Sequence, residues 1–320
     1  MFRCGCCLAV CLYGNAVFVS ITNALIFIIF HSRFYIKFSL SLSSLFISGA
    51  LLAMSTAIQF DLFVSQEIRQ IIADVESRLP SCPDDKRMLP NEVVRSALFT
   101  ARNRRTPRAH LRNSQIAVIG TGTITYTGEE LRQDDELVWM QLIHLAKKVP
   151  LSDAVEFTPY EFLKSISKTT GKENYSWLRN CLSRMQATAV AIYSERLGEG
   201  ISASLIRKFS WVDESGKSLK KWCVWLEPEM RSLFDEVSWL NWEQRRDLPD
   251  GIASKLMGYW ASHKNPLPVK LSTLQSLCGS TSSPREFKRS LIGALDELHR
   301  VKFLESFSIV NGLVSVRRLS

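Results

Sequence analysis

The stretch Pro284-Arg-Glu-Phe-Lys-Arg-Ser-Leu-Ile-Gly-Ala-Leu-Asp-Glu-Leu-His-Arg300 decides the fold. Apolar residues recur through it at the spacing of one helix face, and these are Phe287, Leu291, Leu295 and Leu298. This periodicity predicts an amphipathic helix with one apolar side. The basic residues Arg285, Lys288 and Arg289 lie off the apolar stripe. The opposite side of the helix is therefore expected to carry positive charge.

A hairpin pattern follows this helix. Phe303 to Ile309 and Leu313 to Leu319 lie on either side of the turn Val310-Asn311-Gly312, and Asn-Gly in this position is a strong hairpin signal. Upstream, Asp250 to Ser262 and Leu271 to Cys278 have helical patterns. The order helix, helix, helix, hairpin is that of a winged-helix domain, in which the third helix can enter a major groove and the hairpin lies against the backbone.

The same order occurs once before in the chain. Its helices are expected at about Asp134 to Lys148, Tyr160 to Ser167 and Tyr175 to Tyr193, and its hairpin strands at Ala203 to Trp211 and Trp222 to Glu227. On the third of these helices the side chains expected to point away from the apolar face are Ser176, Asn180, Ser183 and Arg184. We therefore predict an α+β fold, mainly helical, with two tandem winged-helix domains.

Four segments follow from these patterns. They are an apolar N-terminal segment at 1–58, a segment at 59–112 with a short peptide, a linker and a basic arm, winged-helix domain 1 at 113–228 and winged-helix domain 2 at 229–320. The length of 320 residues is sufficient for two cores. Prolines at Leu79-Pro80-Ser81-Cys82-Pro83 indicate the linker.

The apolar N-terminal segment has two explanations. Cys7 to Phe30 and Ser39 to Ile58 are each long enough to cross a bilayer as a helix, which predicts a transmembrane hairpin. Such a hairpin would place Arg33 and Lys37 outside, against the positive-inside tendency. Alternatively, Met54 is the true start and the residues before it are not translated. The mass of the N-terminal peptide of the expressed protein distinguishes the two.

Charge and motif content favour binding over catalysis. The formal net charge is +9, which suits a phosphate-rich partner and also many ordinary soluble proteins. The five histidines are not clustered, the eight cysteines lack paired zinc spacing, and no nucleophile-elbow, Walker or zinc-protease motif occurs. We therefore expect no enzyme activity, no metal and no cofactor, and a reducing, cytoplasmic location.

Three local features bear on this expectation. Arg102, Arg104, Arg105, Arg108 and Arg112 lie close together without apolar periodicity, which predicts an exposed basic arm. Gly120-Thr-Gly122 lacks the third glycine of a phosphate loop and is interpreted as a turn. Asp134 and Asp135 are interpreted as capping acids, because a helix N-terminus is positive, and His144 as a packed residue and not a ligand.

Several runs of residues resemble one family, the TrfA replication initiators of broad-host-range plasmids. The runs that carry the resemblance are Arg95 to Arg108, Ile124 to Trp139, Cys181 to Ala189 and Leu267 to Ser280. The similarity extends from about Leu89 to the C-terminus. An apolar N-terminus is a departure from what this family leads us to expect.

The resemblance implies a DNA-binding initiator that binds origin repeats, called iterons, through tandem winged helices. It implies opening of an adjacent A+T-rich region, recruitment of host proteins such as the replicative helicase and the host initiator, and an inactive homodimer. DNA contact is carried over to Arg179, Arg184, Arg285, Lys288 and Arg289, with Arg104 and Arg105 as weaker backbone candidates.

Gln59-Phe-Asp-Leu-Phe63 also resembles the pentapeptide by which such initiators bind the replicative sliding clamp. Gln59 would fix the register by hydrogen bonds, while Leu62 and Phe63 would fill apolar pockets. Phe60 departs from the usual leucine.

Two other functions use the same architecture. A membrane-tethered winged-helix transcriptional regulator would use the apolar hairpin as its anchor and would have no need of a clamp-binding peptide. A winged-helix protein that binds other proteins would show weak, salt-insensitive association with DNA, whereas a DNA-binding protein loses affinity steeply as salt rises.

Overall fold

The computed structural model describes residues 9–13, 16–21, 24–29 and 78–319. The chain divides into two compact units, Met1–Gln66 and Glu67–Ser320. In the first unit, β1 (Ala9–Tyr13), β2 (Ala16–Ile21) and β3 (Ala24–Ile29) form an antiparallel sheet in the order β1-β2-β3.

The expectation of a helix through Cys7 to Phe30 is wrong for the described residues, which are strands. The physical reason lies in the composition, since β-branched and aromatic residues favour strands and the pairs Gly14-Asn15 and Thr22-Asn23 interrupt the apolar run. Ser39 to Ile58 lies outside the described residues. Among the described residues, no helix is both long and apolar enough to cross a membrane.

The second unit is built around α3 (Gln133–Ala146), which is buried along almost its whole length. Trp139 of α3 is 1% exposed and lies between two aromatic rings, with centroid distances of 5.7 Å to Phe99 and 6.2 Å to Phe234. Phe99 belongs to β5 (Phe99–Thr100) and Phe234 to the 3₁₀ helix η1 (Pro228–Asp235). Segments more than a hundred residues apart therefore share one core.

Two parts of this unit have the same order of elements. The first consists of α3, β9 (Val155–Phe157), α4 (Pro159–Ser165), α5 (Lys172–Gln186), β12 (Lys208–Val212) and β13 (Ser218–Trp225). The second consists of α7 (Ile252–Ala261), β15 (Val269–Lys270), α8 (Leu271–Leu277), α9 (Pro284–Arg300), β16 (Leu304–Val310) and β17 (Leu313–Arg318).

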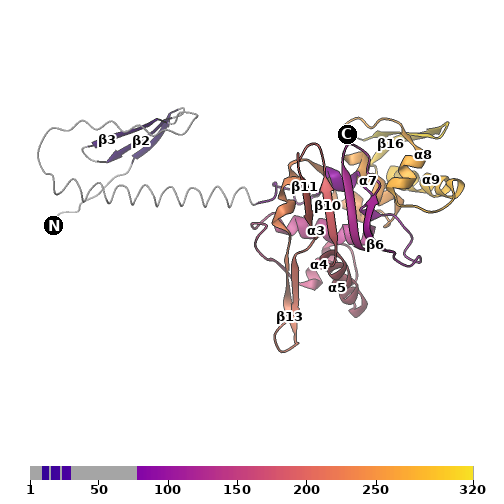
Figure 1. Ribbon diagram of the computed structural model, residues 1–320, viewed down its shortest axis with the longest axis horizontal. Helices are drawn as coiled ribbons and strands as arrows, with labels where there is room; N and C mark the ends of the chain where they lie inside the picture. Colours follow the sequence, from indigo (N-terminus) through magenta and orange to yellow (C-terminus); the bar gives the residue numbers. More distant parts are fainter. Residues whose placement is uncertain (1–8, 14–15, 22–23, 30–77, 320) are drawn as a thin grey trace, which may run out of the picture. The chain divides into compact units, whose positions relative to one another are not determined.

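Their sheets also share one topology. The strand order is β12-β13-β9 in the first part and β15-β17-β16 in the second, so in each case the last strand lies between the other two. In each part the first strand comes between the first and second helices, and the hairpin comes after the third helix. Figure 1 shows the hairpin of β13 and the hairpin of β16 in separate places on the unit.

A four-stranded antiparallel sheet in the order β11-β10-β7-β6 completes the first part. Its strands are β6 (His110–Ile116), β7 (Thr123–Glu129), β10 (Ala189–Tyr193) and β11 (Gly200–Ala203). The alternating burial of β10 places Val190 and Ile192 in the core and leaves the side chains between them exposed. The helix expected through Tyr193 therefore ends at Gln186, because the period changes from helical to strand-like after Thr188.

Strands that the sequence analysis left unassigned form two further pairs. β4 (Lys86–Pro90) pairs with β14 (Val237–Asn241), and β5 pairs with β8 (Leu131–Arg132). The helix α2 (Asn91–Val94) follows β4, and α6 (Trp242–Asp247) follows β14. The boundary expected between 113–228 and 229–320 does not coincide with a division between compact units, and residues 86–100 are core and not linker.

Candidate nucleic-acid interface

The helix α9 begins with a complete capping box. Ser283 Oγ accepts a hydrogen bond from Glu286 N at 3.3 Å, and Glu286 Oε2 accepts one from Ser283 N at 3.1 Å. Pro284 occupies the first helical turn, where its missing N–H has no cost. These signals explain why the sequence predicts the start of this helix correctly.

The outer side of α9 carries the predicted basic residues. Its apolar stripe, which is Phe287, Leu291, Ala294, Leu295 and Leu298, is buried. Arg285, Lys288 and Arg289 are exposed, and none of the three makes an ion pair within the part of the chain that the structure describes. Three exposed cations on an ordered helix form a surface suited to phosphates and base edges.

The helix α5 presents a smaller polar surface. Its buried side consists of Leu178, Cys181, Leu182 and Met185. Arg179, Asn180 and Ser183 are exposed on the other side, as the sequence predicts. The helix is thus anchored by one face and open on the other.

Arg184 does not point outward with them, so that expectation is corrected. Its Nη2 lies 2.8 Å from Asp135 Oδ1, and its side chain is 13% exposed against 0% for Asp135. Burial of the guanidinium opposes its charge, but the neighbouring Asp135 outweighs this and the pKa of Arg184 is raised. Because Arg184 pairs with the buried carboxylate of Asp135, it stabilises the fold and is not a DNA contact.

The basic arm is fixed at both ends and is not a free loop. Arg102 Nε donates to Gly279 O at 2.7 Å and lies 3.3 Å from Glu130 Oε1. At the other end, Arg108 binds Asp134 at 2.9 Å and Asp135 at 2.8 Å. These arginines pair with buried acids that lie far from them in the sequence, so composition alone does not predict the pairs.

Between these anchors, Arg104 and Arg105 are exposed. Arg104 contacts Asp250 through a hydrogen-bonded ion pair, while Arg105 N donates to Asn103 Oδ1 at 2.9 Å. The arm thus has a fixed backbone on which the guanidinium of Arg104 is paired with Asp250, and the role of Arg104 and Arg105 as contacts to the DNA backbone stays a prediction.

Asp134 and Asp135 do more than cap α3. Asp135 Oδ2 accepts a hydrogen bond from Arg132 N at 3.0 Å, as a capping acid does. The two carboxylates also lie beside Cys181, with one potential metal ligand atom from each residue within 4.8 Å of the others. However, Arg108 and Arg184 already bind these carboxylates, which favours an ion-pair cluster over a metal site.

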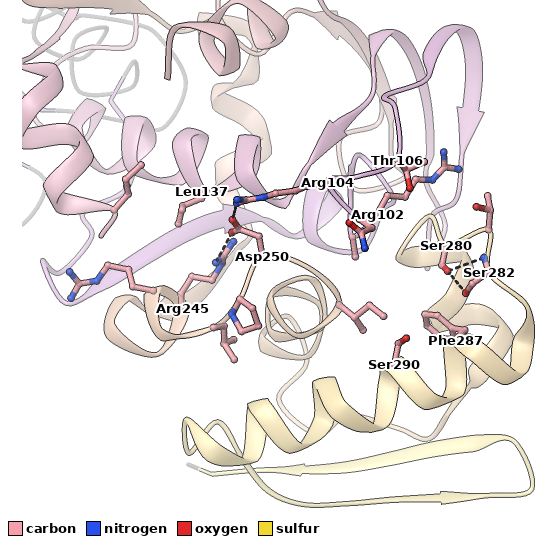
Figure 2. A pocket seen from close by; sticks show the side chains of 18 of the residues that line it. Arg102, Arg104, Thr106, Leu137, Arg245, Asp250, Ser280, Ser282, Phe287 and Ser290 are labelled. Carbon is pink, nitrogen blue, oxygen red and sulfur yellow. Dashed lines mark hydrogen bonds and ion pairs between the residues drawn. The ribbon is translucent and has the colours of Figure 1, made fainter. Parts of the chain in front are cut away.

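Two clefts flank the arm. One of about 650 Å³ lies between the arm and α5, and its lining includes Arg108, Lys172 and Trp177. The other, of about 840 Å³, lies between the arm and the start of α9 (Figure 2). Both are lined in part by Arg104 and Thr106.

Some exposed cations were not singled out from the sequence. On the β12–β13 hairpin these are Lys208, Lys217, Lys220 and Lys221, and the half-buried cations Lys168 and Arg246 of the larger cleft were not singled out either. The hairpin lysines could have been found from the density of lysine in a predicted hairpin. The clamp-binding candidates Gln59, Leu62 and Phe63 lie outside the described residues.

Comparisons with known proteins point to one family. The family model described as TrfA protein matches residues 53–318. A curated relative, the plasmid replication initiator protein TrfA of Escherichia coli, is 37% identical over 241 residues, which is 74% of this chain. The chain spans 63% of the length of that relative.

Solved structures of domains 2 and 3 of RctB are also similar in part. One has a TM-score of 0.47 at 14% identity and covers 68% of this chain and 94% of that structure. A second has a TM-score of 0.45 at 14% identity and covers 71% of this chain and 96% of that structure.

Proposed function

Because the chain belongs to the TrfA family, we propose that it is a plasmid replication initiator that binds repeated sequences at an origin through two winged-helix domains. The observation that carries the proposal is the exposed, unpaired basic side of α9 directly ahead of the β16–β17 hairpin. A helix of this kind can lie in a major groove while the hairpin contacts the backbone.

The repeated topology supports winged helices as the architecture. In both parts a strand separates the first and second helices, and the hairpin after the third helix pairs with that strand. Winged-helix domains have this arrangement, with the third helix as the recognition helix. α5 and α9 are therefore the proposed recognition helices.

The two helices differ in what they offer to DNA. α9 presents Arg285, Lys288 and Arg289, which suit both phosphates and guanine edges. α5 presents Arg179 with the short polar residues Asn180 and Ser183. In the proposed complex, α9 contributes more electrostatic affinity, and Arg104 and Arg105 of the arm contact the backbone.

The host partners follow from the same proposal. An initiator bound at repeats would promote opening of the adjacent duplex and recruit the replicative helicase and the host initiator. The peptide from Gln59 to Phe63 would bind the sliding clamp, and a homodimer would be the inactive form. Support for these partners rests on the family and on the residues of the peptide.

Footprinting of the purified chain on the plasmid that encodes it tests the proposal. Protection of tandem repeats at an origin is the expected result. Protection of a single promoter operator would replace the initiator with a transcriptional regulator. Weak binding that does not respond to salt would instead indicate a protein-binding module, because release of counterions makes DNA binding strongly salt-dependent.

A further inference from the structure

The larger cleft has an unusual balance of charge. Its lining comes from the arm, the end of α4, the α6–α7 region and the loop before α9, and its volume is about 840 Å³. Five cationic side chains line it against one acidic side chain, Asp250; the five are Arg102, Arg104, Lys168, Arg245 and Arg246. The lining of this cleft includes none of the proposed contacts Arg179, Arg285, Lys288 and Arg289 of α5 and α9.

Asp250 is shared by three of these cations. It contacts Arg104 directly, lies 3.9 Å from Arg245 Nη1 and lies 3.8 Å from Lys168 Nζ. Figure 2 shows Arg104 and Arg245 meeting Asp250 from two sides. One carboxylate cannot neutralise three cations, so the wall retains positive charge.

Acids behind the cleft do not remove this excess. Glu130 lies 3.3 Å from Arg102, and Glu136 lies 3.9 Å from Arg245. Within the described residues, Arg246 has no acidic partner and only stacks at 5.8 Å over the ring of Trp242. The five cations of the cleft therefore outnumber the three nearby acids, even when Glu130 and Glu136, which do not line the cleft, are counted with Asp250.

Arg245 is also incompletely bonded. Its side chain is 1% exposed, and its Nε has no hydrogen-bond partner in the described part of the chain. Its remaining contacts are long, the shortest being 3.4 Å from Nη2 to Gln133 O. A buried donor without a partner costs free energy, and an anion in the cleft would offset that cost.

The opposite wall offers neutral donors. Ser280, Thr281 and Ser282 line it just ahead of α9. Ser280 Oγ and Ser282 Oγ lie 2.9 Å apart, so their hydroxyls form one polar edge (Figure 2). Hydroxyls facing guanidinium groups across a cleft suit a tetrahedral oxyanion.

We propose that this cleft binds a phosphate group between Lys168, Arg245 and Arg246 on one wall and the Ser280 to Ser282 edge on the other. The bound phosphate pairs with Lys168 and Arg245, which lie beside Asp250 in the free protein. It comes either from the backbone of bound DNA or from a free small phosphate compound. The site is additional to the contacts of the proposed recognition helices.

Four variants of the full chain test the site. Lys168→Gln and Arg246→Gln each remove a cation from the cleft, and Asp250→Asn removes the competing acid. Lys148→Gln is the matched control, because it removes an exposed cation beyond the opposite end of α3. The melting temperature of each variant shows that it is folded.

Two titrations distinguish the sources of the phosphate. In the first, pyrophosphate binding is measured by calorimetry at constant ionic strength. In the second, the affinity for duplex origin repeats is measured over a range of salt. In whichever titration responds, we expect Lys168→Gln and Arg246→Gln to weaken binding about tenfold, Asp250→Asn to strengthen it about fivefold and Lys148→Gln to leave it unchanged. For DNA, each lost contact lowers the salt slope by about one.

The outcomes separate this site from the proposed function. Pyrophosphate binding with this order of variants supports a free phosphate ligand, even if the chain does not bind origin repeats. The same order on DNA alone supports a backbone phosphate. If Lys168→Gln and Arg246→Gln match the control in both titrations, or if Asp250→Asn also weakens binding, the site is overturned while the binding of repeats by α9 stands.

Discussion

Nη2 of Arg184 lies 2.8 Å from Oδ1 of Asp135, while Arg179, little more than one turn earlier on the same helix, is exposed. Two arginines with equal prospects as DNA contacts in the sequence thus have different places in the fold. The buried Asp135 also holds Arg108 of the arm at 2.8 Å. This carboxylate therefore joins α3, α5 and the arm.

Arg184→Ala is expected to destabilise the fold, because it leaves Asp135 with one guanidinium in place of two. Removal of one partner from a buried ion pair costs about 3 to 5 kcal/mol. Arg179→Ala is expected to leave the free energy of unfolding within about 0.5 kcal/mol of wild type and to weaken the binding of origin repeats. Urea denaturation and fluorescence anisotropy measure the two effects, and equal stability of the two variants would contradict the assignment.

Removal of charge from α9 should reduce affinity more than removal from α5. Arg285, Lys288 and Arg289 are all exposed without an acidic partner within the described residues. The triple alanine variant is expected to lower the slope of log affinity against log salt by about two to three, since each phosphate contact contributes about 0.9. An unchanged slope, with Lys148→Ala as control, would count against α9 as a recognition helix.

The contrast between α9 and Arg184 shows how far the sequence determines this interface. Ser283, Pro284 and Glu286 are local signals within four residues, and they define the start of α9 as the structure has it. The partners of Arg184 and Arg108 lie 49 and 27 residues away. The spacing of residues along one helix or strand gives no information about partners so far apart in the sequence.

The same limit applies to the strands that join the two parts. β4 and β14 pair over a separation of about 150 residues, as Leu89 opposite Ser238 illustrates. Each is a five-residue strand with no hairpin turn to announce it. The α+β class and the hairpins were therefore predictable, whereas the union of both parts into one compact unit was not.

The clamp-binding peptide gives a prediction outside the described residues. The double variant Leu62→Ala and Phe63→Ala is expected to lose binding to the purified sliding clamp, because it removes both apolar anchors. Its affinity for duplex origin repeats should equal that of wild type. Surface plasmon resonance with immobilised clamp measures the first effect. Retention of clamp binding by the double variant would remove the peptide from the proposed function.

Gly279 and Gly293 should respond to alanine in opposite ways. Gly279 ends α8 with φ +63°, and a Cβ there would lie 2.7 Å from Thr100 Cγ2. Gly279→Ala is therefore expected to destabilise the fold by about 1 to 3 kcal/mol. Gly293 lies within α9 with nothing within 4 Å of a built Cβ, so Gly293→Ala should stabilise by about 1 kcal/mol. Thermal denaturation of both variants measures the two signs.

Protonation of His144 is expected to lower the free energy of unfolding in mild acid. Burial, together with the nearby Arg87 and Lys147, lowers the pKa of His144 from 6.5 to about 4. The unfolded chain therefore takes up a proton below about pH 6.5 that the folded chain resists down to about pH 4, so stability is lost as pH falls through this window. The expected loss over this window is about 3 kcal/mol. His144→Gln, which does not titrate, should lose less stability than wild type between pH 7 and pH 4.5 in urea denaturation; an equal loss would assign the effect to other groups.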